Sequence, residues 1–151
     1  MYRPNKFKIL AISSSGGHLD QLIKILEYFD SDDVLLGTFN KSDAHEKVKL
    51  YEHFWLRYPT NRNIANNILN LCKGLVIEVR FSPKVYISTG AASAVVFAII
   101  ARVFRKKFIY VEPIDRIKLP TLTAKLLMLM GVDIYVYWDS QLKNYKKRVQ
   151  I

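Results

Sequence analysis

The feature that most constrains this chain is the alternation of short apolar runs with longer segments whose apolar residues recur at helical spacing. About six runs have the length and the β-branched and aromatic content of strands. They are 7–13, 33–39, 54–59, 84–89, 107–112 and 133–138. The helical segments are 19–29, 41–53, 64–79, 91–104, 121–130 and 139–148. This alternation predicts an α/β, Rossmann-like parallel sheet with helices on both faces.

No repeat, low-complexity tract or linker divides the chain, so a single domain, 1–151, is expected. The most hydrophobic stretch, 85–104, is interrupted by polar residues and closed by Arg102. It predicts a buried strand, a turn and a buried helix rather than a membrane span, and a shallow membrane contact is the alternative.

The segment 64–79 carries an apolar stripe that we expect to face the core. Its members are Ile64, Ile68, Leu71, Cys72, Leu75, Val76 and Val79. Cys72, the only cysteine, is therefore interpreted as a core side chain rather than a nucleophile. Thr60 or Asn61 is the expected N-cap.

The chain is strongly basic, with a formal net charge of +10 from 23 Lys and Arg against 13 Asp and Glu. Such a balance favours an anionic partner, which includes nucleic acid, anionic lipid and phosphorylated ligands. Basic residues concentrate at 102–107 and 143–148, as solvated surface or as a membrane-facing surface. Nucleic acid is disfavoured because no recognition helix or RNA-binding motif is present.

Cysteine and histidine usage narrows the chemistry further. One cysteine allows no intrachain disulfide, which fits a reducing compartment. The three histidines lack metal-ligand spacing, so no metal is expected. The first residues have too short an apolar run for a signal peptide.

Ligands of such sheets bind beyond the carboxyl ends of the strands, which directs attention to the loops 13–18, 88–93 and 112–120. The first loop, "SSSGGH", is either a plain turn or a phosphate loop at a helix N-terminus. It matches neither the dinucleotide nor the Walker pattern. His18, which ends it, is either an ordinary helix residue or a base on this edge.

The other two loops also allow two interpretations each. In "STGAASAV", small residues explain tight helix–sheet packing, and Gly90 also allows a ligand to approach closely. In the third loop, Glu112, Asp115 and Arg116 follow a buried strand. They form a structural ion pair, or they hold a hydroxyl-rich acceptor or act as a base.

Four segments together make the chain recognisable: "SSSGGHLDQL", "YPTNRN", "ISTGAASAV" and "YVEPIDRIKLPTLTAKLL". In this order they resemble the oligosaccharide-biosynthesis family of the asparagine-linked-glycosylation type, whose bacterial members serve capsular and exopolysaccharide synthesis. The resemblance covers essentially the whole chain. It implies the N-terminal, acceptor-side half of a split GT-B glycosyltransferase, with a separate catalytic subunit that carries most of the nucleotide-sugar site.

The resemblance also implies roles for individual residues. Gly16 and Gly17 are expected near a lipid diphosphate, and His18 is expected to contact the acceptor or to be its general base. Glu112 and Asp115 are the next candidates for the base. The other expected acceptor-binding residues are Ser14, Ser15, Thr89, Gly90 and Arg116.

The expected function is that of one subunit of a two-component enzyme that moves a sugar from a UDP-sugar to a polyprenyl-diphosphate-linked saccharide, with inverting, metal-independent chemistry. A heterodimer at the cytoplasmic face of the cell membrane, peripheral or monotopic, is expected. Eukaryotic relatives carry an N-terminal membrane anchor, whereas this chain begins almost directly at its first strand. Attachment is therefore expected through basic and apolar surface or through the lipid acceptor. The alternative is a non-catalytic scaffold that only recruits its partner.

Overall fold

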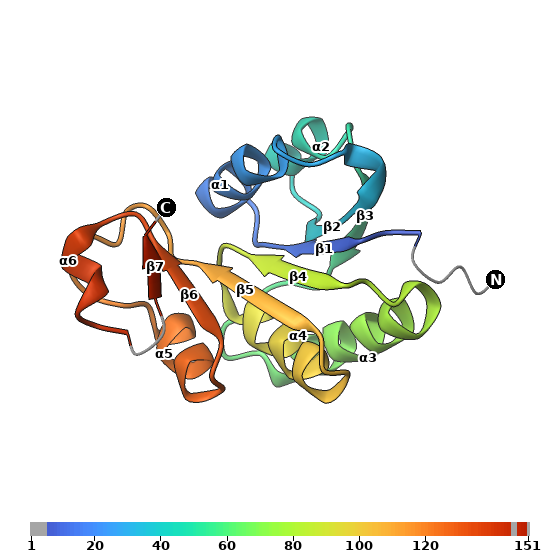
Figure 1. The fold of residues 1–151 in the computed structure, drawn as a ribbon. Coiled ribbons are helices and arrows are strands. Elements are labelled where there is room, and N and C mark those ends of the chain that lie inside the picture. The colour runs from blue at the N-terminus through green and yellow to red at the C-terminus, as the bar shows by residue number, and fades with distance from the viewer. Residues whose placement is uncertain (1–5, 146–147, 151) are drawn as a thin grey trace.

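The structure, a computed structural model, describes residues 6–145 and 148–150 as a parallel sheet with helices on both faces (Figure 1). The strands are β1 Ile9–Ile12, β2 Val34–Phe39, β3 Glu52–Leu56, β4 Val85–Ser88, β5 Lys107–Val111, β6 Asp133–Val136 and β7 Arg148–Gln150. Their order across the sheet is β3-β2-β1-β4-β5-β6-β7, and every neighbouring pair is parallel. The predicted Rossmann-like architecture is confirmed. The order reverses between β1 and β4, which is where such sheets bind ligands.

The helices lie in two layers. They are α1 Gly17–Leu26, α2 Ser42–Lys47, α3 Ile64–Phe81, α4 Ala92–Val103, α5 Leu122–Leu129 and α6 Asp139–Leu142, with a short 3₁₀ turn at Ser31–Asp33. In Figure 1, α1 and α2 lie on one side of the sheet, and α3, α4 and α5 lie on the other. None of the helices in the described part of the chain is long and apolar enough to cross a membrane.

Alternation along the strands builds a separate core on each face of the sheet. In β1, Leu10 and Ile12 pack into the core under α3, α4 and α5, whereas Ile9 and Ala11 pack into the core under α1 and α2. Side chains of a strand point alternately to opposite faces, so an entirely apolar strand must be covered on both. The stretch 85–104 accordingly forms β4, a turn and the largely buried α4, as predicted.

Two predicted helices are shorter than expected. The helix expected over 41–53 ends at Lys47, because Val48 and Tyr51 close a turn and bury their side chains before β3 begins at Glu52. The helix expected over 139–148 ends at Leu142, and 148–150 pairs with β6 as a seventh strand. The side chains of the second basic cluster, 143–148, lie partly outside the described residues.

The prediction for α3 was wrong in the face that it buries. Ile68 and Val76 are 53% and 65% exposed, and Cys72 is exposed as well. Of the predicted stripe, Leu71 is partly buried against the core. The N-cap is neither Thr60 nor Asn61, because Asn63 Oδ1 accepts the Asn66 N–H at 2.9 Å.

The opposite face of α3 is buried because it offers close approach and specific hydrogen bonds. A Cβ on Gly74 would lie 2.4 Å from Ile100 Cδ1, so glycine lets α3 pack closely on α4. Buried Glu78 accepts a hydrogen bond from the Tyr86 hydroxyl at 2.5 Å and pairs with Lys106 at 3.4 Å. Helix α3 therefore presents its apolar stripe outward.

Candidate functional site

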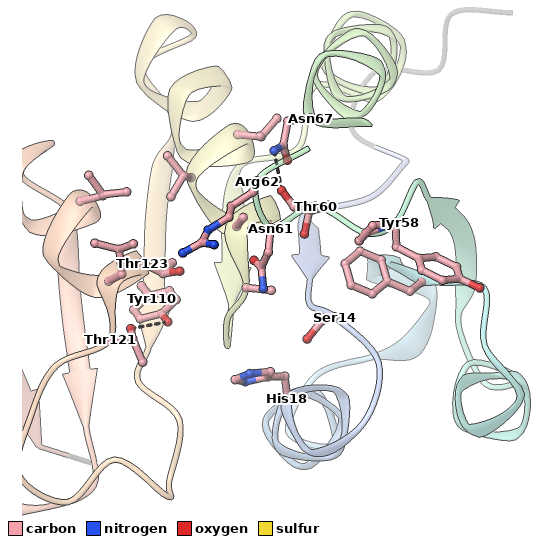
Figure 2. A pocket seen from close by; sticks show the side chains of 18 of the residues that line it. Ser14, His18, Tyr58, Thr60, Asn61, Arg62, Asn67, Tyr110, Thr121 and Thr123 are labelled. Atoms are coloured by element: carbon pink, nitrogen blue, oxygen red, sulfur yellow. Dashed lines mark hydrogen bonds between the residues drawn. The ribbon is translucent and has the colours of Figure 1, made fainter. Parts of the chain in front are cut away.

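A cleft of about 840 Å³ opens at the carboxyl ends of the strands, beside the point where the strand order reverses (Figure 2). Its lining comes from the ends of β1 and β2, the starts of α1, α3, α4 and α5, the loop after β3, and β5 with the loop that follows it. The residues are Ser14, His18, Phe39, Lys41, Tyr58, Pro59, Thr60, Asn61, Arg62, Asn67, Ala91, Ala92, Val95, Val96, Tyr110, Arg116, Thr121, Leu122, Thr123 and Leu126.

The glycine loop reaches this cleft only in part. Ser14 lines the cleft, whereas Ser15, Gly16 and Gly17 are not among its lining residues. Gly16 has a φ of 78°, a left-handed conformation that favours glycine. Its N–H donates to Asp43 Oδ2 at 2.7 Å, so a carboxylate of α2 already occupies this backbone donor.

His18 brings the first two loops together. A Cβ on Gly90 would lie 2.7 Å from His18 Nδ1, so the imidazole lies in the space that the missing side chain leaves. The Thr89 hydroxyl donates to the His18 carbonyl at 2.6 Å, which ties the start of α1 to the end of β4. His18, Thr89 and Gly90 were all predicted from sequence, and the structure places them in contact.

The imidazole of His18 is suited to accept a proton. Burial lowers its pKa below the ordinary value of 6.5, while a hydrogen bond to the Thr89 backbone and the charge of Asp115 raise it and Arg116 lowers it. The net direction favours the neutral ring at neutral pH. A half-buried, neutral imidazole facing a cleft has the properties of a general base.

Glu112, the second candidate base, is not among the residues that line the cleft, although it bonds Thr121, which is. Its carboxylate is buried and accepts the Thr121 N–H at 2.7 Å and the Thr121 hydroxyl at 3.2 Å. Burial raises the pKa of Glu112, and hydrogen bonds from Thr121 and Tyr145 oppose that effect. Since Thr121 is the N-cap of α5, Glu112 fixes the start of that helix.

Asp115 and Arg116 are neighbours in the turn after Glu112, but only one of them reaches the cleft. The Asp115 side chain is 73% exposed and does not line the cleft, whereas Arg116 does. Their closest approach, 3.9 Å from Arg116 Nε to Asp115 Oδ2, is that of an exposed ion pair. Gln141 of α6 donates to the Arg116 carbonyl at 2.6 Å and so holds the loop that carries Arg116.

The largest group of site residues that sequence reasoning missed lies between β3 and α3. Residues 58–62 all line the cleft. Asparagines of α3 hold this loop: Asn67 Nδ2 donates to the Thr60 carbonyl at 2.7 Å, and buried Asn70 bonds both the N–H and the carbonyl of Arg57 at 2.8 and 3.0 Å. The signal was available, because "YPTNRN" follows a parallel strand and must reach the same edge of the sheet.

The cleft combines a cationic part with an apolar wall. Lys41, Arg62 and Arg116 are its fully charged lining residues, and no Asp or Glu is among the described residues that line it. The apolar wall is formed by α4 and α5. Its members are Ala92, Val95, Val96, Leu122 and Leu126. Such a cleft is suited to an anionic ligand that also carries an apolar portion.

Comparison with solved structures shows which proteins share this fold. MurG of Acinetobacter baumannii matches 94% of this chain with a TM-score of 0.75 at 8% identity. A glycosyltransferase of Rickettsia africae matches 97% with a TM-score of 0.64 at 19% identity. This chain spans 44% and 43% of those two chains, respectively. The fold is that of the N-terminal half of a GT-B glycosyltransferase.

Sequence comparison gives the more particular relationship. No protein-family model matches the sequence. The UDP-N-acetylglucosamine transferase subunit ALG14 of Saccharomyces cerevisiae is 25% identical over 181 residues, which covers 93% of this chain and 73% of that protein. Over almost its whole length the chain therefore resembles ALG14, which agrees with the family resemblance of its sequence motifs.

Proposed function

We propose that this chain is the acceptor-binding subunit of a two-component glycosyltransferase that moves a sugar from a UDP-sugar to a polyprenyl-diphosphate-linked saccharide. The observation that carries the proposal is the cleft, which joins a cationic part, an apolar wall and the neutral imidazole of His18. The cationic part suits the diphosphate, and the apolar wall suits the prenyl chain. The products belong to capsular, exopolysaccharide or lipid-linked oligosaccharide synthesis.

In the proposed reaction His18 removes the proton from the acceptor hydroxyl. The oxygen attacks the anomeric carbon of the donor from the face opposite the leaving group, with inversion. The bond from that carbon to the UDP oxygen breaks, and UDP leaves with the electron pair. The imidazolium then releases its proton to water. Donors on the partner subunit stabilise the leaving diphosphate, with no metal ion required.

The relative found by sequence comparison supports a second subunit, because ALG14 is itself a subunit of a UDP-N-acetylglucosamine transferase. This chain spans less than half of the similar solved glycosyltransferases. We propose that the missing half, which binds the nucleotide-sugar, is supplied by a catalytic partner in a heterodimer. This chain alone is then expected to transfer little or no sugar.

We further propose that the outer surface of α3, α4 and α5 lies against the cytoplasmic face of the membrane, as a peripheral or monotopic contact. This α3–α5 surface exposes Ile64, Ile68, Leu69, Leu75, Val76, Val79, Ile99, Val103, Leu122, Leu126 and Leu129. Its four cations, Lys73, Arg80, Arg102 and Lys125, are exposed, whereas the one carboxylate of these helices, Glu78, is buried. Apolar side chains flanked by cations favour an anionic lipid surface, at about 1 kcal/mol per cation.

The test is transfer by the reconstituted complex. This chain, its catalytic partner and a polyprenyl-diphosphate-linked sugar are mixed with a panel of labelled UDP-sugars. Transfer is expected only when both subunits are present, and His18→Ala is expected to lower the turnover roughly 100- to 10,000-fold. Transfer by this chain alone would contradict the two-component proposal.

The same experiment separates the proposal from the scaffold alternative. A complex with His18→Ala that turns over at the wild-type rate would remove His18 from the reaction. If substitutions of Ser14 and Thr89 also left the rate unchanged, this chain would act only by recruiting its partner.

A further inference from the structure

Arg62 differs from Lys41 and Arg116, the other cations of the cleft, in its left-handed backbone conformation. Its backbone is left-handed, with a φ of 54°, a conformation that costs a residue other than glycine about 1–3 kcal/mol. Its guanidinium projects into the cleft, on the side of Tyr110 and Thr123 (Figure 2). We propose that Arg62 binds the diphosphate of a prenyl-diphosphate-linked acceptor and so places the acceptor sugar beside His18. This inference rests on the proposed function.

The loop that carries Arg62 is held before any ligand arrives. Asn66 Nδ2 donates to the Pro59 carbonyl at 2.9 Å, and Asn67 Nδ2 donates to the Thr60 carbonyl at 2.7 Å. Asn70 bonds both backbone groups of Arg57, at the start of the loop. Because three side chains of α3 hold the backbone of Arg57, Pro59 and Thr60, the turn that carries Arg62 is formed before a ligand binds, which lowers the cost of ordering it.

The charges around the cleft favour Arg62 over the glycine loop as the diphosphate site. At the glycine loop, Asp43 already accepts the Gly16 N–H, and Lys47 pairs with Asp20 at 2.6 Å and with Asp43 at 4.0 Å. A diphosphate would have to displace one carboxylate and approach another. Arg62, by contrast, has no acidic partner among residues 6–145, and its planar guanidinium can bond two phosphate oxygens at once.

A diphosphate in this cleft has two chemical sources, the lipid acceptor and the UDP of the donor. The lipid is favoured, because the apolar side chains of Val95, Leu122 and Leu126 line the same cleft. Helix α5 carries Leu126 and then exposed Leu129, so the apolar wall continues outward onto the α3–α5 surface. A prenyl chain has a continuous apolar path there, which a uridine does not need.

The experiment measures binding of geranyl diphosphate, geranyl monophosphate and UDP to the full chain by calorimetry. Arg62→Gln is compared with Arg105→Gln, a matched control with the same φ of 54° on an exposed residue outside the cleft. Asp43→Ala frees the Gly16 N–H and tests the glycine loop as the alternative site. Thermal unfolding confirms that each variant is folded.

The proposal predicts that Arg62→Gln weakens geranyl diphosphate binding roughly 10- to 100-fold. Arg105→Gln and Asp43→Ala should each change it by less than about twofold. The wild-type chain should prefer geranyl diphosphate to the monophosphate and to UDP, and Arg62→Gln should lose most of the first preference.

Three outcomes would overturn the assignment in different ways. Unchanged binding by Arg62→Gln, with tighter binding by Asp43→Ala, would move the diphosphate to the glycine loop. Tighter binding of UDP than of geranyl diphosphate would assign the cleft to the donor. No binding of geranyl diphosphate by the wild-type chain would overturn the acceptor role itself, so failure of the proposed function is distinguishable from failure at Arg62.

Discussion

The imidazole of His18 lies against the backbone of Gly90, where a Cβ would fall 2.7 Å from Nδ1. Gly90 lies in the loop between β4 and α4 and has a φ of 148°, which few residues other than glycine adopt. Two loops separated by some seventy residues of sequence are thereby fitted to each other at the switch point of the sheet. The glycine is required by the histidine as well as by the turn.

Gly90→Ala is therefore expected to destabilise the chain by about 1–3 kcal/mol and to displace the His18 ring. In a His18→Ala background the steric part disappears and only the backbone strain remains, so the loss should be smaller. The measurement is the free energy of unfolding in urea for the four chains of this cycle. Gly17→Ala is the control, because its Cβ meets nothing within 4 Å and it should cost less than about 0.5 kcal/mol. Equal losses in both backgrounds would contradict the contact.

The lowered pKa of His18 predicts where the pH profile of kcat/KM falls on its acid side. A base must be unprotonated, so kcat/KM of the complex should fall as the pH drops through a midpoint below 6.5. Asp115 raises the pKa of His18, so Asp115→Asn should move this limb to still lower pH. Asp32→Asn, an exposed change in the 3₁₀ turn before β2, is the control. A limb above 6.5, or no movement with Asp115→Asn, would contradict the assignment.

The same shift links His18 to stability. Since folding favours the neutral ring, the contribution of His18 is present above 6.5 and is lost as the pH falls toward its folded pKa. His18→Gln should remove that part of the decline in the free energy of unfolding. Urea titrations between pH 5 and 7.5 would measure it.

Glu112→Gln should leave catalysis largely intact. The raised pKa means that folding favours the protonated carboxyl, whose contribution is present below 4.5 and is lost as the pH rises through the folded pKa. Glutamine imitates that protonated form, so the free energy of unfolding at pH 7 should be unchanged or higher. Turnover should fall less than about tenfold, whereas a loss of about 1,000-fold would identify Glu112 as the base. Glu112→Ala, which strands the Thr121 N–H, should cost about 1–3 kcal/mol.

Asn70→Ala tests whether α3 holds the loop after β3. Asn70 is fully buried and bonds both backbone groups of Arg57, so its loss should cost about 2 kcal/mol. Hydrogen exchange across 57–63 should become faster, because the loop loses its anchor. Asn66→Ala removes a more exposed bond to Pro59 and should have a smaller effect. Unchanged exchange in Asn70→Ala would show that the loop holds itself.

The sequence predicted the sheet of this protein better than it predicted the helices. The apolar runs predicted β1 to β6 and three of the loops at the cleft, because parallel strands buried on both faces need continuous apolar sequence. The strand at 148–150 was missed because so short a strand is defined by its pairing with β6 rather than by its composition. The 57–63 loop was missed as a site, although it follows a parallel strand and so reaches the edge of the sheet that carries the cleft. What the sequence does not show is that buried Asn70 of α3 holds this loop in place.

The outward stripe of α3 shows a different limit. An apolar stripe on a helix predicts that this face is buried against something. The pattern alone does not say whether it packs on the same chain or on a partner or membrane. The opposite face of α3 packs on α4 and β4 through Gly74, Ile77 and Glu78. Ile68 and Val76 therefore stay exposed and are available to a partner outside this chain.

Ile68→Glu with Val76→Glu is therefore expected to weaken membrane binding without unfolding the chain. Both side chains are exposed, so the free energy of unfolding should change by less than about 1 kcal/mol. Flotation with vesicles of phosphatidylcholine and phosphatidylglycerol should show at least about a tenfold loss of bound protein. The double variant loses two apolar side chains that would enter the lipid and adds two carboxylates that an anionic surface repels. The matched control is Tyr28→Glu with Leu50→Glu, which changes two side chains, 88% and 79% exposed, outside the α3–α5 surface. Equal flotation of the two double variants would show that the α3–α5 surface does not contact the lipid. If the wild-type chain bound pure phosphatidylcholine as well as it binds the anionic vesicles, the cations would not contribute to membrane binding.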